Sequence, residues 1–319
     1  MGSIFWRRYF LLCICFFLSS SDIWGQQDAT TKKARLSFQW VNPLSASERK
    51  RHPYLKHATF KSRSLGQKVG YCIYLPPHYS YPSWQSQKFP VVYYLHGGRP
   101  GSETKSIRLV DTIHDAIESG EVSPMIYVFL NGGPVSHYNL PGDSNAQGAD
   151  VFIKELIPHI DQNYRTISHR GGRGIEGFSQ GGRGTARLMF RYPDLFCSAS
   201  PGGAGHATEK KISENAGAES EKLVFERGDN TWDLATAYAK RMKEDVGQPR
   251  VKILVHVGDQ GFNYANNLQW MAHLRDLGIE HQSLVVPKAK HSALQIYEKV
   301  GVRIMRFHEQ QFAEFTKKQ

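Results

Sequence analysis

Cysteine is scarce in this chain, with four residues among 319, and two of them (Cys13 and Cys15) lie inside an apolar run near the N-terminus. No Cys-x-x-Cys pair and no cluster of cysteine with histidine occurs, so the sequence predicts no structural zinc or other metal site. The remaining two, Cys72 and Cys197, could form one disulfide in an oxidising compartment or persist as buried thiols. The sequence leaves both alternatives open.

The N-terminal apolar run is too short to cross a bilayer comfortably, because a membrane-spanning helix needs about 20 apolar residues. This run, Tyr9–Leu18, follows Arg7 and Arg8 and precedes small and polar residues that extend to Gly25. That order is typical of a secretory signal peptide, and we expect cleavage after Gly25 and export of the mature chain, secreted or periplasmic. An uncleaved N-terminal anchor is the alternative.

Acidic residues are outnumbered, with 29 Asp and Glu against 40 Lys and Arg, and the formal net charge is +11. Loss of the first 25 residues would remove two arginines and one aspartate and leave +10. The basic residues are scattered, without interleaved aromatic residues or a recognition-helix pattern, so no nucleic-acid partner is expected. A solvated basic surface is the favoured interpretation.

Internal repeats and low-complexity tracts are absent, and hydrophobic and charged contents of 40% and 22% are typical of a globular protein. We expect three parts along the chain. These are a signal peptide over residues 1–25, a polar arm or linker over residues 26–55, and one α/β domain over residues 56–319.

Short apolar segments alternate with segments of helical spacing from about Thr59 onward, which predicts a mostly parallel sheet with helices on both faces. The expected strands cover Val69–Leu75, Val91–Leu95, Met125–Leu130, Gly174–Phe178, Lys222–Glu226, Val251–Val257 and Leu284–Val286. The expected helices cover Ile107–Ser119, Ala149–Asn163, Gly182–Tyr192, Leu234–Lys243, Leu268–Leu277 and Ile296–Phe315. The small and polar residues 202–220 are interpreted as a surface excursion.

A Gly-x-Ser-x-Gly motif, Gly177 to Gly181, stands between an expected strand and an expected helix. A sharp strand-to-helix turn exposes the serine hydroxyl, and it requires glycine two residues before and two residues after the serine for lack of space. Ser179 is therefore the candidate nucleophile.

The sequence His96-Gly97-Gly98 directly follows the strand Val91–Leu95. A loop at this place donates one backbone N–H to a developing oxyanion, and the residue after the nucleophile donates the other. We assign these amides to Gly98, with Gly97 as second choice, and to Gln180. A tight turn that needs glycine for its backbone alone is the alternative, and His96 is expected to be structural.

The base should come late in the chain, and His291 lies in a polar loop between the last strand and the closing helix. There an imidazole can reach Ser179. The other later histidines are competitors: His206, His256, His273, His281 and His308.

The acid of such a triad orients the imidazole and stabilises its charged form. Asp259 is the candidate, because it follows the strand Val251–Val257. It could instead merely cap the loop, and Asp229 and Asp233 are fallbacks.

At these residues the chain resembles the esterase family of the α/β hydrolases, which includes feruloyl and acetylxylan esterases, enterochelin esterases and S-formylglutathione hydrolases. The likeness runs from about Thr59 to Phe312 and includes Tyr74-Leu75-Pro76-Pro77, Leu95-His96-Gly97-Gly98, Glu155-Leu156-Ile157-Pro158, the Gly177–Gly182 turn and Tyr192-Pro193-Asp194-Leu195-Phe196.

The resemblance implies an α/β-hydrolase fold and hydrolysis of carboxylic esters, acyl or feruloyl groups on polysaccharide among them, without a metal or organic cofactor. The sequence departs from the family at position 261, where the pattern Gly-x-x-Asp would place the acid and this chain has Gly261. Two alternatives therefore stay open: an acyltransferase of the same fold, and a catalytically impaired carbohydrate-binding relative.

Overall fold

The computed structural model describes residues 38–206 and 228–316. The expected signal peptide and the expected strand Lys222–Glu226 lie outside these residues. Residues from Phe38 onward form one compact unit. The segment expected as an arm or linker therefore contributes residues 38–55 to this unit, where Trp40 and Leu44 are buried.

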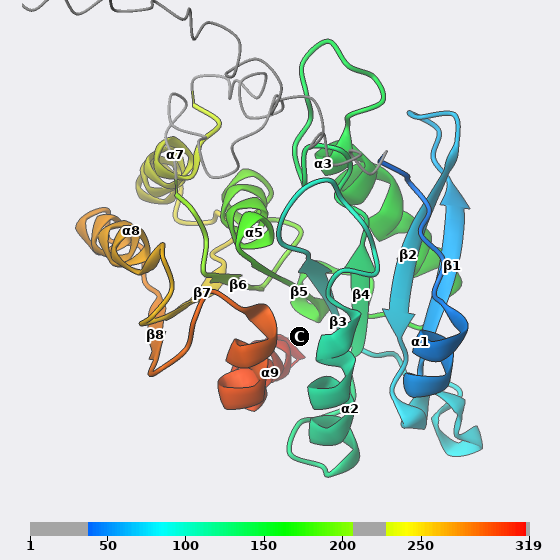
Figure 1. The fold of residues 1–319 in the computed structure, drawn as a ribbon. Coiled ribbons are helices and arrows are strands. Elements are labelled where there is room, and N and C mark those ends of the chain that lie inside the picture. The colour runs from blue at the N-terminus through cyan, green and yellow to red at the C-terminus, as the bar shows by residue number, and fades with distance from the viewer. Residues whose placement is uncertain (1–37, 207–227, 317–319) are drawn as a thin grey trace, which may run out of the picture. The chain divides into compact units, whose positions relative to one another are not determined.

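An eight-stranded sheet forms the centre of this unit, in the order β1-β2-β4-β3-β5-β6-β7-β8 (Figure 1). The strands are β1 Leu55–Lys61, β2 Lys68–Tyr74, β3 Val91–Leu95, β4 Ile126–Leu130, β5 Arg173–Phe178, β6 Ser198–Gly202, β7 Lys252–Gly258 and β8 Gln282–Val286. β1 and β2 pair antiparallel with each other and β2 pairs antiparallel with β4, whereas all pairs from β4 to β8 are parallel. The expected α/β fold with a mostly parallel sheet is confirmed.

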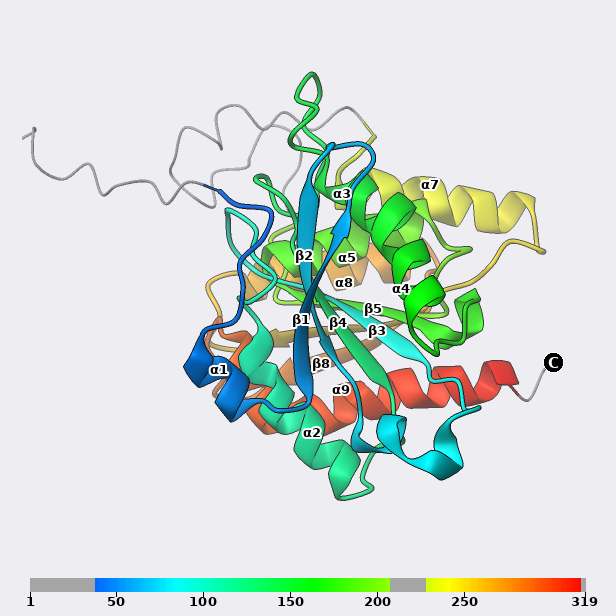
Figure 2. The same cartoon turned by 90° about the vertical axis from the view of Figure 1, so that its right-hand side faces the viewer.

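Helices cover both faces of the sheet (Figures 1 and 2). One face carries the helical segment from Gly148 to Asn163 together with α5, α7 and α8, and the other carries α2 and α9. The main helices are α1 Ala46–Arg51, α2 Val110–Glu118, α3 Gly148–Asp150, α4 Ile157–Asn163, α5 Gln180–Arg191, α7 Thr231–Glu244, α8 Tyr264–Asp276 and α9 Ala293–Thr316, with a π-helical stretch at Val151–Leu156 between α3 and α4.

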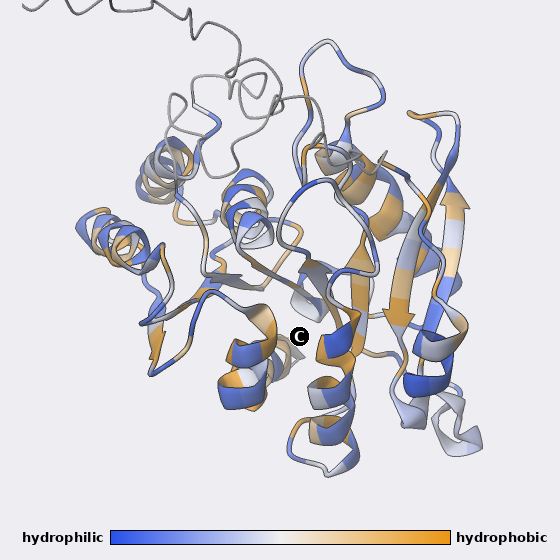
Figure 3. Cartoon of the chain, in the orientation of Figure 1, coloured by the Kyte–Doolittle hydropathy of each residue, from blue (hydrophilic) through white to orange (hydrophobic). Residues whose placement is uncertain are grey.

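β3 and β4 are central strands of the sheet. They are apolar because helices cover both of their faces. In β3, Val91, Tyr93 and Leu95 pack on one side of the sheet, and Val92 and Tyr94 pack on the other. Of these two strands, β4 is orange in the hydropathy view (Figure 3). A run that is apolar at every position is therefore a strand buried on both faces.

Two strands carry no sequence signal of the expected kind. β1 is an edge strand with several exposed, charged or polar residues, so it lacks the apolar run that marks the inner strands. β6 reads Ser-Ala-Ser-Pro-Gly, and small residues with proline normally indicate a turn. Close packing requires glycine at its end, since a Cβ on Gly202 would lie 2.0 Å from Cε1 of His256.

The interpretation of residues 202–220 as a surface excursion is wrong for their first part. Gly202 to His206 are buried. They include and follow the end of β6, and side chains of α8 form hydrogen bonds with the backbone of Ala204 and His206. Among the described residues, no helix combines the length and apolar character that a membrane span requires.

Candidate active site

Ser179 lies at the sharp turn between β5 and α5, at the carboxyl end of the central strands. Its φ of 60° and ψ of −116° are a conformation that non-glycine residues seldom adopt. A Cβ on Gly177 would lie 2.5 Å from the Gly181 carbonyl oxygen, and one on Gly181 would lie 1.9 Å from the Leu95 carbonyl oxygen. The expected requirement for glycine on both sides of the serine is confirmed.

His291 lies opposite Ser179, in the loop between β8 and α9. Its Nε2 is 2.9 Å from Ser179 Oγ, which is hydrogen-bond distance. The structure thus brings together the nucleophile and the base that the sequence predicts. The competing histidines contact other partners among the described residues: His206 stacks on Trp270, His273 lies beside Trp232, His281 contacts the Ile279 carbonyl, His308 contacts Ser198, and His256 is buried in β7.

Asp259 is not the residue at the other imidazole nitrogen, and that prediction is wrong. The side chain there is Asn263, whose Oδ1 lies 3.2 Å from His291 Nδ1. Residues 258–261 form a tight turn closed by a hydrogen bond from the Gly261 amide to the Gly258 carbonyl, and Asp259 in this turn is exposed to solvent. The chain then turns inward, and Asn263 at the start of α8 reaches the histidine.

The two alternative acids, Asp229 and Asp233, contact other residues. Asp229 forms ion pairs with Arg187 and Arg191, and Asp233 accepts hydrogen bonds from the Gly228 amide and the Asn230 side chain near the start of α7. Sequence reasoning missed Asn263 because it sought a carboxylate. The usable signal was position: Asn263 follows the predicted acid strand in the same loop.

The predicted oxyanion donors surround the nucleophile. Gly97, Gly98 and Gln180 line one pocket together with Ser179 and His291. Gly98 has a φ of 68°, and among the described residues neither its amide nor that of Gln180 has a hydrogen-bond acceptor. Two unused amides beside a nucleophile are what an oxyanion hole requires. Their assignment stays a prediction.

Neighbouring loops hold the Gly98 segment in place. The Ser136 hydroxyl donates to the Gly98 carbonyl at 2.6 Å. Buried Glu103, a few residues further on, accepts hydrogen bonds from the Asn42 amide and the Asn131 side chain and contacts His57. The loop after β3 is thus fixed by three separate parts of the chain.

His96 has a structural role. Its Nε2 accepts a hydrogen bond from the Gly132 amide at 3.1 Å, and its carbonyl accepts one from His137 Nε2. Burial lowers the pKa of His96 well below its usual value and lowers that of His137 to about 4. Both imidazoles are neutral and serve as fixed hydrogen-bonding groups under the oxyanion loop.

The pocket at Ser179 has a volume of about 360 Å³ and carries an aromatic wall. Phe178 and Phe262 flank His291, with ring centroids 4.9 and 4.2 Å from the imidazole. Phe262 is 76% exposed, which is unusual for a phenylalanine. Among the described residues, no group of three His, Cys, Asp or Glu side chains could hold a metal ion.

Comparison with known families assigns this architecture. The family model described as "Putative esterase" matches residues 62–315, which is most of the chain. The chain belongs to this esterase family.

Curated relatives of this esterase-family chain include an esterase of Mycobacterium tuberculosis, 27% identical over 262 residues. The match covers 74% of this chain and 55% of the relative, so the chain spans about half the length of that protein. An endo-1,4-beta-xylanase/feruloyl esterase of Xylanibacter ruminicola is 28% identical over 153 residues, covering 46% of this chain and 21% of the relative.

Solved structures share the fold. A ferulic acid esterase has a TM-score of 0.68 at 22% identity and covers 81% of this chain and 97% of its own. The S-formylglutathione hydrolase of Staphylococcus aureus has a TM-score of 0.66 at 18% identity, covering 80% of this chain and 98% of its own.

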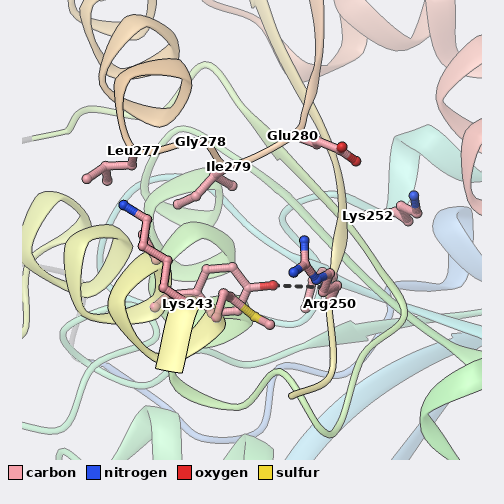
Figure 4. Close-up of a pocket in the computed structure, with 11 residues that line it drawn as sticks. Lys243, Arg250, Lys252, Leu277, Gly278, Ile279 and Glu280 are labelled. Atoms are coloured by element: carbon pink, nitrogen blue, oxygen red, sulfur yellow. Dashed lines mark hydrogen bonds between the residues drawn. The ribbon is translucent and has the colours of Figure 1, made fainter. Parts of the chain in front are cut away.

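A second pocket of this esterase-family chain, of about 270 Å³, lies between the end of α7, the start of β7 and the α8–β8 connection (Figure 4). Lys243, Arg250, Lys252 and Glu280 surround an apolar floor, and the Tyr238 hydroxyl accepts a hydrogen bond from the Val251 amide. The pocket lies at the amino ends of the parallel strands, whereas Ser179 lies at their carboxyl ends. The two are therefore at opposite ends of the strands. None of the described residues that line it form a pair of nucleophile and base such as Ser179 and His291.

Proposed function

We propose that this protein is an exported serine esterase that hydrolyses carboxylic esters through an acyl-enzyme formed on Ser179. The observation that carries the proposal is the hydroxyl of Ser179, held in a strained turn 2.9 Å from His291 Nε2. A serine paired with a base beside two unused amides is the arrangement that acyl transfer needs. Family membership supports the same reaction.

The reaction proceeds in two halves. His291 Nε2 takes the proton of Ser179 as its Oγ bonds to the ester carbonyl carbon, and the Gly98 and Gln180 amides stabilise the oxyanion. The alcohol leaves with the proton from His291. Water then gives a proton to His291 and attacks the acyl carbon, the Oγ–carbon bond breaks, and Ser179 regains its proton.

The aromatic wall supports esters with a flat, apolar acyl group, such as a feruloyl group on polysaccharide. Phe262 is largely exposed beside His291, so its ring can contact an aromatic acid bound at Ser179, and such contacts favour aromatic partners. A relative whose name includes feruloyl esterase supports the same substrate class.

Export rests on the N-terminal sequence, with Arg7 and Arg8 before a short apolar run and Gly25 as the expected cleavage site. Expression of the full chain in a secreting host, followed by N-terminal sequencing of the exported product, tests it. We expect Gln26 as the first residue. Retention of the intact N-terminus in the membrane fraction would contradict cleavage.

Activity is tested with a fluorophosphonate probe and a panel of esters. We expect covalent labelling that maps to Ser179. Methyl ferulate should be hydrolysed faster than an aliphatic ester of equal size. Ser179→Ala should lose both the labelling and the hydrolysis. Addition of acceptor alcohols separates hydrolysis from transfer, because a transferase would release the new ester as its main product. Labelling at another serine would refute the site.

A further inference from the structure

Asn263 joins two parts of the active site that are distant in sequence. Its side chain is buried, and its Oδ1 lies 3.2 Å from His291 Nδ1. On its other side, its Nδ2 donates a hydrogen bond to the carbonyl of Gly203, just after β6. The amide therefore has one defined neighbour on each side.

The contact with Gly203 fixes which way the amide faces. If the amide were turned over, its oxygen would lie against the Gly203 carbonyl oxygen, and two acceptors would face each other in a buried place. The oxygen must therefore face His291, and it can only accept. A proton is thereby required on Nδ1, which leaves Nε2 with the lone pair that takes the proton of Ser179.

We infer that Asn263 is the positioning residue of this active site and does with a neutral amide what a carboxylate does in a Ser-His-Asp triad. It holds the imidazole in the tautomer that can act as a base. Unlike a carboxylate, it adds no negative charge to stabilise the imidazolium. The inference rests on the proposed function, since it assigns a role within the same site.

Two asparagines of α8 contact the same segment of the chain as Asn263. Asn267, one helical turn further on, donates to the Ala204 carbonyl at 2.6 Å, and Asn266 exchanges hydrogen bonds with the backbone of His206. Asn263 and the two asparagines of α8 thus all contact residues 203–206, and Asn263 also contacts His291.

The test compares variants at position 263 with a matched variant one turn away. Asn263→Leu keeps the size of the side chain but has no acceptor, and we expect fluorophosphonate labelling of Ser179 to slow by about 10² to 10⁴-fold. Asn263→Asp restores an acceptor for His291 but cannot donate to Gly203. We expect its labelling to lie within about 10-fold of the wild type, with the acidic limb of its pH profile at higher pH, because the carboxylate favours the imidazolium.

Asn267→Leu is the control, because it loses a similar contact with residues 203–206 without touching His291. We expect it to unfold at a lower temperature but to keep the labelling rate and the pH profile. Labelling of Asn263→Asp as slow as that of Asn263→Leu would show that the residue serves only the Gly203 contact, and would overturn the inference. So would an unchanged rate in Asn263→Leu.

The tautomer of His291 can be measured independently of the reaction. ¹⁵N chemical shifts of the His291 ring, assigned with His291→Gln, should show a protonated Nδ1 and an unprotonated Nε2 in the wild type above the titration of this histidine. A protonated Nε2 would overturn the inference even if esters are hydrolysed. A protonated Nδ1 in a protein that neither labels nor hydrolyses esters would support the inference and refute the proposed function.

Discussion

Glu176 is a buried carboxyl group in β5, three residues before the nucleophile, and the reaction does not use it. The hydroxyl of Tyr297 lies 2.8 Å from each of its oxygens, and His308 Nε2 lies 3.7 Å from one of them. Burial raises the pKa of Glu176 to about 8, and the hydrogen bond from Tyr297 opposes this shift in part. At neutral pH the group is therefore held mainly in its protonated form.

This raised pKa makes stability fall as the pH rises. In the unfolded chain Glu176 loses its proton near its ordinary value of 4.5, whereas the folded protein keeps it until about pH 8. Between these pH values the folded state holds one more proton than the unfolded state. The free energy of unfolding therefore falls by roughly 3 to 5 kcal/mol as the pH rises from the lower to the higher value. We expect Glu176→Gln to match the wild type near pH 4.5 and to be more stable at pH 8. Urea unfolding at the two pH values measures this, and an equal pH slope in both proteins would contradict it.

Phe262 is expected to affect selectivity more than stability, since its ring is largely exposed yet stacks beside His291. Phe262→Ala should lower kcat/KM for a feruloyl ester about 5-fold, mainly through KM, because an aromatic contact is worth about 1 kcal/mol. Hydrolysis of an acetyl ester should change little. Leu268→Ala, a partly exposed residue of α8, is the control. An equal loss on both esters would show that Phe262 positions His291 instead of the substrate.

At the scale of elements, the site depends on how closely the amino end of α5 packs against the ends of β3 and β6. Gly181 leaves room for the Leu95 carbonyl at the end of β3, and Gly182 leaves room for the Gly202 carbonyl at the end of β6. Both obstacles are backbone atoms, which cannot rotate away. The helix amino end and the nucleophile are therefore set by the sheet itself.

Gly181→Ala should unfold or displace this turn, because its Cβ would lie 1.9 Å from a backbone oxygen. We expect a loss of about 3 kcal/mol or more in the free energy of unfolding, and no labelling of Ser179 in any folded fraction. Gly278→Ala is the comparison: it has a φ of 74° with open space around it, and should cost only about 1 kcal/mol with activity kept. A stable and active Gly181→Ala would contradict the packing described.

Across the whole molecule, the two cysteines of the described chain are both free and both buried. Of the two alternatives that the sequence left open, the structure shows the thiols. Cys72 lies in β2 and Cys197 directly precedes β6, and these strands are separated by three others in the sheet. Burial raises the pKa of Cys197 to about 11, which leaves little reactive thiolate at neutral pH.

The protein should therefore contain no structural disulfide between these cysteines. With residues 1–25 removed, we expect a thiol reagent such as DTNB to react with two groups after unfolding and with almost none before. The unfolding temperature should be the same with and without reductant. Two thiols that appear only after reduction would contradict this expectation.

Much of the sheet could be predicted from sequence, because several inner strands, β3, β4 and β7 among them, are nearly continuous apolar runs. Val91–Leu95 was predicted with its observed bounds, and the predicted strands near β2, β4, β5, β7 and β8 overlap the observed ones. β6 could not be predicted, since its small residues and proline indicate a turn, and the His256 ring that requires Gly202 belongs to β7, distant in sequence. Local sequence carries no record of such a distant neighbour.

The sequence by itself identified the candidate nucleophile and the candidate base, because a strained turn needs a distinctive spacing of glycines and the base is expected in a loop after the last strand. Only the tertiary structure decided the third member. Asn263 reaches His291 because a tight turn directs Asp259 outward and the carbonyl of Gly203, distant in sequence, orients the amide. Hydrogen bonding in a buried place depends on which partners the fold brings together, and residue type alone does not specify them.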